Sequence, residues 1–253
     1  MRVIVTRPTA QAAEWVTRLR ACGIDAVALP LIGIAPTADT AAIEMAWTQL
    51  SDRQLVVFVS PNAAEQFFTH RPAQADWPAT VRAGSPGPGT TRTLRGLGVP
   101  EDRIIEPSAD AAQFDSESLW ARLENHDWEG ADVLIVRGEG GGRDWLATTL
   151  RCHGAQVAHL AAYRRAAPVM SAADHGLLAA AHATPAAHLW IFSSSEAIDN
   201  LAPALPGALW EDARAVTTHP RIAERARRLG FSSVIEVRPT LDAVVACIQS
   251  MRP

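Results

Sequence analysis

The sequence predicts an α/β protein made of two similar domains with parallel sheets, the second inserted into the first and joined to it by a two-stranded linker. Three observations predict this class. Short β-branched runs alternate with helical patterns, three pairs of distant segments resemble each other, and prolines mark two places where the chain crosses between the copies. With 253 residues, 48% of them hydrophobic, the chain is long enough for two cores of ordinary size.

Strands and helices alternate along the whole chain. The predicted strands are VIV (3–5), VVFV (56–59), VLIV (133–136), LWIF (189–192) and SVIEV (233–237). The predicted helices are Gln11–Ala21, Arg143–Cys152, Ala172–His182, Pro220–Leu229 and Leu241–Met251. Helices of about 10 to 15 residues between apolar strands are typical of parallel sheets that are covered on both faces.

The two copies are recognisable segment by segment. VIVTRPTAQAAEW near the start resembles VLIVRGEGGGRDW near the middle, so that Arg7 matches Arg137, Trp15 matches Trp145 and, after a one-residue slip, Leu29 matches Leu160. FVSPNAAEQF (58–67) resembles FSSSEAIDNL (192–201), and GPGTTRTLRGLGV (87–99) resembles HPRIAERARRLGF (219–231). Three such pairs in one chain indicate an internal duplication.

The order of these segments predicts the domain organisation. If each sheet receives one copy of the arginine turn, residues 1–35 plus 168–253 form the first domain and residues 38–163 form the inserted one. The stretches 33–38 and 163–169, each with a proline, are then the two linker strands. A double crossing predicts a hinge, with an anionic small molecule held in a cleft between the domains.

Charge and composition exclude several functions. A net charge of −4 and a pI near 6.1 speak against a nucleic-acid partner. All 23 basic residues are arginine, so the chain has no lysine for a Schiff base or for a phosphate-binding loop of the Walker type. The GEGGGR stretch departs from a dinucleotide fingerprint, since Arg143 stands where the third glycine belongs.

The cysteines and the hydropathy exclude further classes of protein. Cys22, Cys152 and Cys247 are scattered without CxxC spacing, so neither a disulfide framework nor a metal site is expected, and no cofactor is implied. No apolar run is long enough for a membrane span, and the amino terminus is typical of a strand rather than a signal peptide. We expect a cytoplasmic protein.

Candidate binding residues lie in the turns that follow the predicted strands, because ligands of open parallel sheets bind beyond the carboxyl ends of the strands. Most of these turns precede helices, where free N–H groups attract carboxylates, and the arginines add charge. The candidates are Arg7, Ser60, Pro61, Asn62, Thr90, Arg137, Gly138, Ser193, Ser194, His219 and Arg221.

Several of these residues also have a purely structural interpretation. Ser60, Thr90 and Ser195 are placed where helix N-caps are expected, and capping alone would explain them. Trp15 and Trp145 are expected in the core. Tyr163, the only tyrosine, is either a half-buried packing residue whose hydroxyl meets water or a group that donates a proton or hydrogen bond to a leaving oxygen.

Taken together, the motifs resemble those of the bacterial uroporphyrinogen-III synthases along nearly the whole chain. The resemblance lies in VIVTRPTAQAAEW, PLIGIAP, FVSPNAAEQF, GPGTTRTLRGLGV, FDSESL, VLIVRGEGGGRDWLATTLRCHGAQV, YRR and HPRIAERARRLGF. It implies two α/β domains on a two-stranded linker. It also implies a cofactor-free enzyme of haem biosynthesis that cyclises hydroxymethylbilane to uroporphyrinogen III, with loss of water and inversion of the last pyrrole ring.

The resemblance assigns roles to several residues. Tyr163 is implied to assist loss of the terminal hydroxyl group, and Ser60, Thr90, Ser193 and Ser194 match hydroxyl residues of the family's site. At residues 219–222 the sequence HPRI departs from a Gly-Pro-Thr-Thr-like turn, so His219 or Arg221 would replace hydroxyl contacts there.

The implied partner is hydroxymethylbilane alone, handed over by the preceding enzyme to a monomer, without nucleic acid or membrane. The alternative is a two-domain ligand-binding or sensor module for an anionic small molecule that catalyses nothing.

Overall fold

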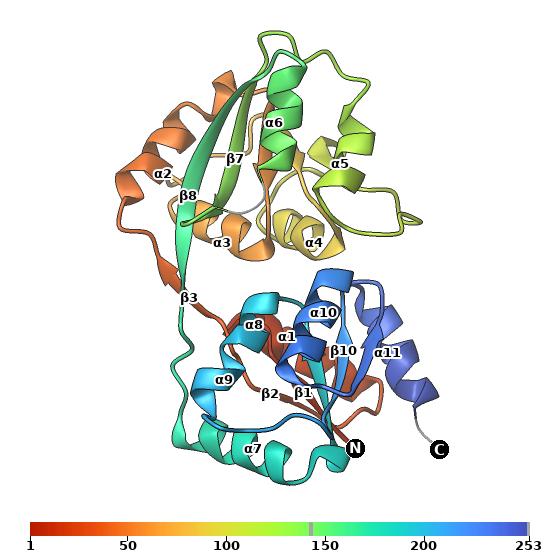
Figure 1. The fold of residues 1–253 in the computed structure, drawn as a ribbon. Helices are drawn as coiled ribbons and strands as arrows, with labels where there is room; N and C mark the ends of the chain where they lie inside the picture. The colour runs from red at the N-terminus through yellow and green to blue at the C-terminus, as the bar shows by residue number, and fades with distance from the viewer. Residues whose placement is uncertain (142–143, 252–253) are drawn as a thin grey trace. The chain divides into compact units, whose positions relative to one another are not determined.

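The computed structural model describes residues 1–141 and 144–251, and the chain divides into two compact units. Unit 1 comprises Met1–Gly33 and Ala166–Pro253, and unit 2 comprises Ile34–Arg165. Unit 2 is therefore an insertion within unit 1 along the sequence (Figure 1).

Unit 1 contains a parallel sheet of five strands in the order β11-β10-β9-β1-β2. The strands are β1 (Arg2–Val5), β2 (Ala26–Ala28), β9 (His188–Phe192), β10 (Arg214–Thr217) and β11 (Ser233–Glu236). Val3 is aligned with Ala26 on one side and with Leu189 on the other. The prediction that the start of the chain shares a sheet with its last third is confirmed.

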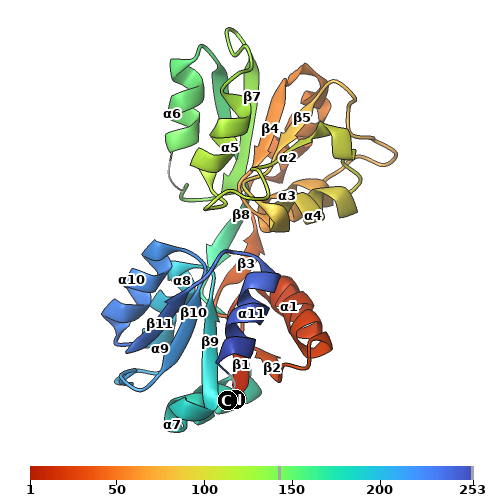
Figure 2. The ribbon, with the colours of Figure 1, turned by 90° about the vertical axis from the view of Figure 1, so that its right-hand side faces the viewer.

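Helices cover both faces of this sheet, as Figure 2 shows. They are α1 (Thr9–Ala21), α7 (Ala172–Ala183), α8 (Ser195–Asp199), α9 (Leu201–Ala204), α10 (Pro220–Leu229) and α11 (Leu241–Ser250). Val3 and Val5 of β1 pack with α1 and α11 in one core. On the other face, Trp190 of β9 meets the ring of Trp210 edge-on at 5.6 Å between centroids. Alternate residues of each strand thus point into different cores.

Unit 2 contains a six-stranded sheet in the order β3-β8-β7-β4-β5-β6. Its strands are β3 (Gly33–Pro36), β4 (Leu55–Phe58), β5 (Arg82–Gly84), β6 (Ile104–Ile105), β7 (Asp132–Gly138) and β8 (Gln156–Ala166). Its helices are α2 (Thr40–Thr48), α3 (Pro61–Thr69), α4 (Pro88–Gly96), α5 (Ser116–Leu123) and α6 (Trp145–Cys152), with 3-10 turns at Leu50–Asp52 and Glu101–Arg103.

Two cores flank the sheet of unit 2. Val56 and Phe58 of β4 pack with α2, α3 and α4, whereas Leu55 and Val57 pack with α5 and α6. All four side chains are buried, since the strand is covered on both faces.

The duplication is visible in the strand order. β7, β8, β4, β5 and β6 of unit 2 occupy the places that β1, β2, β9, β10 and β11 occupy in unit 1. Unit 2 adds β3 beside β8 at its edge. Two of the three resembling segment pairs begin on equivalent strands, and the third covers α4 and α10, which follow the equivalent strands β5 and β10. The repeat inferred from the sequence is therefore a repeat of structure.

Two expectations differ from the structure near the start of α6. The predicted helix from Arg143 begins at Trp145, and Arg143 itself lies outside the described residues. Trp145 is 38% exposed, so its expected place in the core is wrong, whereas Trp15 is buried at 7%. The buried face of α6 consists of Leu146, Ala147 and Leu150, which leaves the first residue of this helix at the surface.

Candidate functional site

The candidate residues lie in each unit at the carboxyl end of its sheet. In unit 1 they follow β1 (Arg7), β9 (Ser193, Ser194) and β10 (His219, Arg221). In unit 2 they follow β4 (Ser60, Pro61, Asn62) and β5 (Thr90), close β7 (Arg137, Gly138) or lie in β8 (Tyr163). Since the paired strands within a unit are parallel, each set shares one edge of its sheet.

Three of these residues are brought into contact in unit 2. The Ser60 hydroxyl oxygen lies 3.2 Å from the Tyr163 hydroxyl oxygen, across 103 residues of sequence. The phenol ring lies over Gly138, where an added Cβ would be 3.0 Å from both Cε2 and Cζ of Tyr163. The ends of β4, β7 and β8 therefore form one small site around the phenol.

An irregularity in the strand pairing aims Tyr163 at this site. Arg137 is paired with Ala161, but Gly138 is paired with Tyr163, so Ala162 is the extra residue of a β-bulge. Leu160, Ala162 and Tyr163 all belong to the core beneath α2, α3 and α4, whereas regular alternation would turn residue 163 to the other face of the sheet. The Glu139 amide donates to the Tyr163 carbonyl at 2.7 Å and fixes the backbone beyond the bulge.

The environment of Tyr163 differs from the structural interpretation given above. The side chain is nearly fully buried rather than half-buried, and its ring belongs to the core beneath α2, α3 and α4. Its hydroxyl group contacts that of Ser60.

The expected helix caps are right for Ser60 and wrong for Ser195 and Thr90. Ser60 is extended and accepts a hydrogen bond from the Ala63 amide at 3.2 Å, as an N-cap of α3 does. In unit 1 the N-cap of α8 is Ser194, and Ser195 is already helical. The N-cap position of α4 is Gly87, so Thr90 lies within the first turn.

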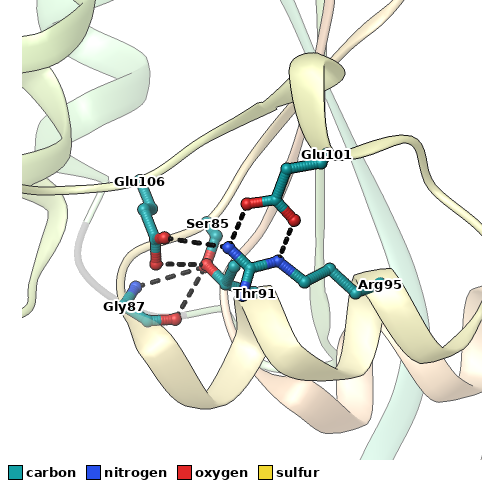
Figure 3. Close-up of polar contacts among 6 residues, drawn as sticks. All are labelled: Ser85, Gly87, Thr91, Arg95, Glu101 and Glu106. Atoms are coloured by element: carbon teal, nitrogen blue, oxygen red, sulfur yellow. Dashed lines mark hydrogen bonds and ion pairs between the residues drawn. The ribbon is translucent and has the colours of Figure 1, made fainter.

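A buried network supports the turn at Gly87–Thr90 (Figure 3). The Ser85 hydroxyl donates to the Gly87 carbonyl at 2.8 Å and accepts from the Gly87 amide at 3.3 Å. The Thr91 hydroxyl lies 2.9 Å from the Ser85 oxygen and 2.6 Å from a carboxylate oxygen of Glu106. Ser85 and Thr91 are at most 1% exposed, so the turn is held from below by side chains without access to water.

Arg95 connects this network to the surface. Its guanidinium group lies 3.5 Å from Glu106 and also forms an ion pair with Glu101 (Figure 3). Thr91 and Glu106 were not among the predicted residues. The only sequence signal for them is their position, one residue after Thr90 and directly after the Ile104–Ile105 strand.

The arginine of unit 2 faces a carboxylate. Arg137 donates to Asp144 at 3.0 Å, and Nε2 of His159 lies 3.1 Å from the same oxygen. Burial, and then the neighbouring Arg137, lower the pKa of His159, while Asp144 acts in the opposite direction. A substrate carboxylate that binds Arg137 would have to share it with Asp144.

The equivalent arginine of unit 1 has a different setting. The Arg7 guanidinium carbon lies 4.0 Å from the centre of the Trp15 ring, and one of its nitrogens is 3.4 Å from the Gln11 amide oxygen. A guanidinium group that stacks on an indole donates its hydrogen bonds in its own plane.

The turn at residues 219–222, whose sequence departs from the family's pattern, is held by a local hydrogen bond. The His219 ring nitrogen accepts from the Arg221 amide at 3.2 Å, so His219 serves as the N-cap of α10. Two buried hydroxyl residues that sequence reasoning missed, Thr217 and Thr218, directly precede it. They lie directly before residues 219–222, where His219 or Arg221 was expected to replace hydroxyl contacts.

The described part of the chain, residues 1–141 and 144–251, holds no group of three or more side chains that could bind a metal ion. Within the same residues no helix is sufficiently long and apolar to cross a bilayer.

Comparison with known proteins agrees with this architecture. Residues 13–246 match the family model of uroporphyrinogen-III synthase HemD. The uroporphyrinogen-III synthase of Salmonella typhimurium is 28% identical over 98% of this chain and 100% of its own length. That of Proteus mirabilis is 31% identical over 65% of this chain and 80% of its own length.

Solved structures show the same fold. The uroporphyrinogen-III synthetase of Helicobacter pylori has a TM-score of 0.60 at 14% identity and covers all of both chains. A mutant uroporphyrinogen III synthase of Thermus thermophilus has a TM-score of 0.58 at 14% identity, over 99% of this chain and 98% of that one.

Two duplicated parallel α/β units, one inserted in the other along the sequence, define the class as a two-domain α/β protein with polar groups at the carboxyl ends of its strands. Within that class, the chain belongs to the uroporphyrinogen-III synthase family. It is accordingly an enzyme of tetrapyrrole and haem biosynthesis, and a binding module without catalysis is not favoured.

Proposed function

We propose that this chain binds hydroxymethylbilane through the strand-end turns of both units and that the Ser60–Tyr163 pair assists loss of the terminal hydroxyl group. The substrate carries many carboxylates. Amide groups at helix starts, together with Arg7, Arg137 and Arg221, suit such a polyanion. The single observation that carries the proposal is the contact of Ser60, Gly138 and Tyr163 at one edge of the unit 2 sheet.

The energetics of the reaction do not require a nucleophile. A hundredfold preference for the inverted over the uninverted ring closure corresponds to only about 2.7 kcal/mol of differential barrier. Holding the two ends of the linear tetrapyrrole in one arrangement is able to supply this amount. Ser193, Ser194, Asn62 and Thr90 would then act by positioning the substrate, and Pro61 by starting helix α3 at the site.

The remaining parts of the proposal concern the surroundings of the enzyme. We infer that it works as a cytoplasmic monomer without a cofactor, receives its substrate from the preceding enzyme, and closes its two units on it. Solution scattering with and without a tetrapyrrole product tests the closure, and sedimentation tests the monomer.

The decisive experiment is incubation with hydroxymethylbilane, followed by chromatographic separation of the isomers. The expected product is the inverted isomer, at a rate well above spontaneous closure. Arg137→Gln should raise KM more than it lowers kcat. The matched control is Arg103→Gln, which removes the same charge from an arginine paired with Asp102 just before β6. A wild-type protein that yields only the uninverted isomer would refute the proposal.

A further inference from the structure

The phenol of Tyr163 is buried and hydrogen-bonded to Ser60. Tyr163 is 1% exposed, and among the residues that the structure describes its hydroxyl group contacts only Ser60. Ser60 is half-buried and stands on the solvent side of the pair. Two hydroxyl groups share this contact, so either one could donate.

The cost of a buried, unpaired proton decides the direction. If Ser60 donated to Tyr163, the phenol proton would have no acceptor among the described residues, and because Tyr163 is 1% exposed this would cost about 1–3 kcal/mol. If Tyr163 donates to Ser60, every buried proton is paired. The hydrogen bond therefore runs from the phenol to the serine.

This direction determines what Ser60 does with its own proton. A serine oxygen has two lone pairs, and here one accepts from the Ala63 amide at 3.2 Å and the other from Tyr163. With both lone pairs occupied, Ser60 takes part in any further hydrogen bond only as a donor. Because Ser60 is half-buried whereas Tyr163 is 1% exposed, this donor belongs to the less buried member of the pair.

We propose that Ser60 is the group that contacts the departing oxygen of the substrate and that Tyr163 acts through it as a positioning residue. This inference rests on the proposed function and refines it. As the C–O bond breaks, its electron pair leaves with the oxygen, while electrons from the pyrrole nitrogen form the exocyclic double bond of the azafulvene. The N–H proton and the departing hydroxide make water, so the protein loses no proton. Ser60 donates a hydrogen bond to the oxygen as its charge develops.

The β-bulge at Ala162 and the absence of a side chain at Gly138 hold the Tyr163 phenol against Ser60. If β8 alternated regularly, residue 163 would share a face with Ala161 instead of with Leu160 and Ala162, so the bulge is what brings the phenol into this core. An alanine at 138 would press on Cε2 and Cζ at 3.0 Å and on the hydroxyl oxygen at 3.4 Å. On this proposal Gly138 leaves room for the phenol ring and does not itself contact the substrate.

The first test compares three single variants. Ser60→Gly keeps an acceptable helix cap but removes the donor, and we expect kcat to fall about 10- to 100-fold with little change in KM, since the lost bond is to a developing charge. Tyr163→Phe should lower kcat only about 3- to 10-fold, because it removes a neutral hydrogen bond. Ser60→Thr, which retains a hydroxyl group, should recover at least about tenfold over Ser60→Gly.

A double variant separates action through Ser60 from direct contact. In the Ser60→Gly background, Tyr163→Phe should change kcat by less than about twofold, because residues that act in series are not additive. If Tyr163 touched the substrate as a general acid, its own loss would cost about 100-fold or more and the two effects would multiply. Either of those results would overturn the proposal.

A spectroscopic test does not depend on activity. Tyr163 is the only tyrosine, so protein labelled with 13C at tyrosine Cζ gives one ring signal. Ser60→Gly and Gly138→Ala should both shift it, whereas Gly176→Ala, with nothing within 4 Å in helix α7, should not. An unshifted signal in Ser60→Gly would refute the hydrogen bond itself. A shifted signal in a protein that forms no uroporphyrinogen III would refute the proposed function instead.

Discussion

Replacement of Thr91 by valine tests whether the network under the Gly87–Thr90 turn stabilises unit 2. Valine has nearly the shape of threonine, so the change removes one hydroxyl group without opening a cavity. Thr91 is 1% exposed, and its hydroxyl group contacts Ser85 at 2.9 Å and Glu106 at 2.6 Å. Water has no route to replace it from the Thr91 side.

The size of the destabilisation depends on which hydrogen bonds Ser85 and Glu106 keep when the Thr91 hydroxyl group is removed. Ser85 retains the Gly87 carbonyl as its acceptor, so its loss is small. Glu106 loses a hydrogen bond to a charged group, worth about 1.5–3 kcal/mol in general. Its side chain is 33% exposed and remains 3.5 Å from Arg95, so water and the guanidinium group compensate in part. We expect a decrease of about 1.5 kcal/mol in the free energy of unfolding.

Urea-induced unfolding followed by circular dichroism measures this change, and the same helix offers a matched control. Thr93→Val makes the same substitution in α4, where the hydroxyl group is exposed and reaches only the Gly89 carbonyl at 3.2 Å. Its effect should stay within about 0.5 kcal/mol. If Thr91→Val proves no more destabilising than Thr93→Val, the network does not stabilise unit 2 and the reasoning fails.

Two further predictions concern steric fit and pH. Gly87→Ala would place a methyl group 2.8 Å from Cβ of Phe114 and should lower the free energy of unfolding by about 1–3 kcal/mol. Gly89→Ala is the control, because the nearest atom to its methyl group would be 3.9 Å away. The melting temperatures of the two variants test the difference. Burial lowers the pKa of His159 from 6.5, so on acidification the unfolded chain takes up the proton first and the native state loses stability below about pH 6.5. His159→Gln should make this loss of stability smaller, by about 1.4 kcal/mol for each pH unit by which the native pKa lies below the unfolded one. If urea unfolding of the variant shows the same pH dependence as the wild type, His159 is not its source.

The fold was predictable because it repeats. Apolar runs at regular spacing identify the strands, and matching segments such as those around Arg7 and Arg137 show which strands are equivalent. The order of the copies along the chain then requires an insertion. Parallel pairing follows because each strand is connected to the next by a helix. These are patterns of several residues, and single departures do not obscure them.

The site was predictable only in its outline. The turns after the strands could be named, but the contact between Ser60 and Tyr163 depends on a bulge at Ala162 that no sequence pattern announces. Ala161 and Ala162 are similar in size and hydrophobicity, so the alternation of the strand gives no sign of the extra residue. The caps at Ser194 and Gly87 were misplaced by one and three residues for a related reason, because several consecutive small polar residues could each end the turn.

The duplication also bears on our proposal that the hydroxyl chemistry takes place in unit 2. Ser194 in unit 1 matches Ser60 in unit 2, and each is the N-cap of the helix that follows its strand. With Leu29 matched to Leu160, the counterpart of Tyr163 is Ile32, which is 6% exposed and has no hydroxyl group. Both units therefore present a serine at the same edge of the sheet, but only in unit 2 does a buried phenol accompany it. On our proposal that Ser60 is the donor, the feature that distinguishes it from Ser194 is the buried tyrosine beside it, which a bulge and a glycine accommodate.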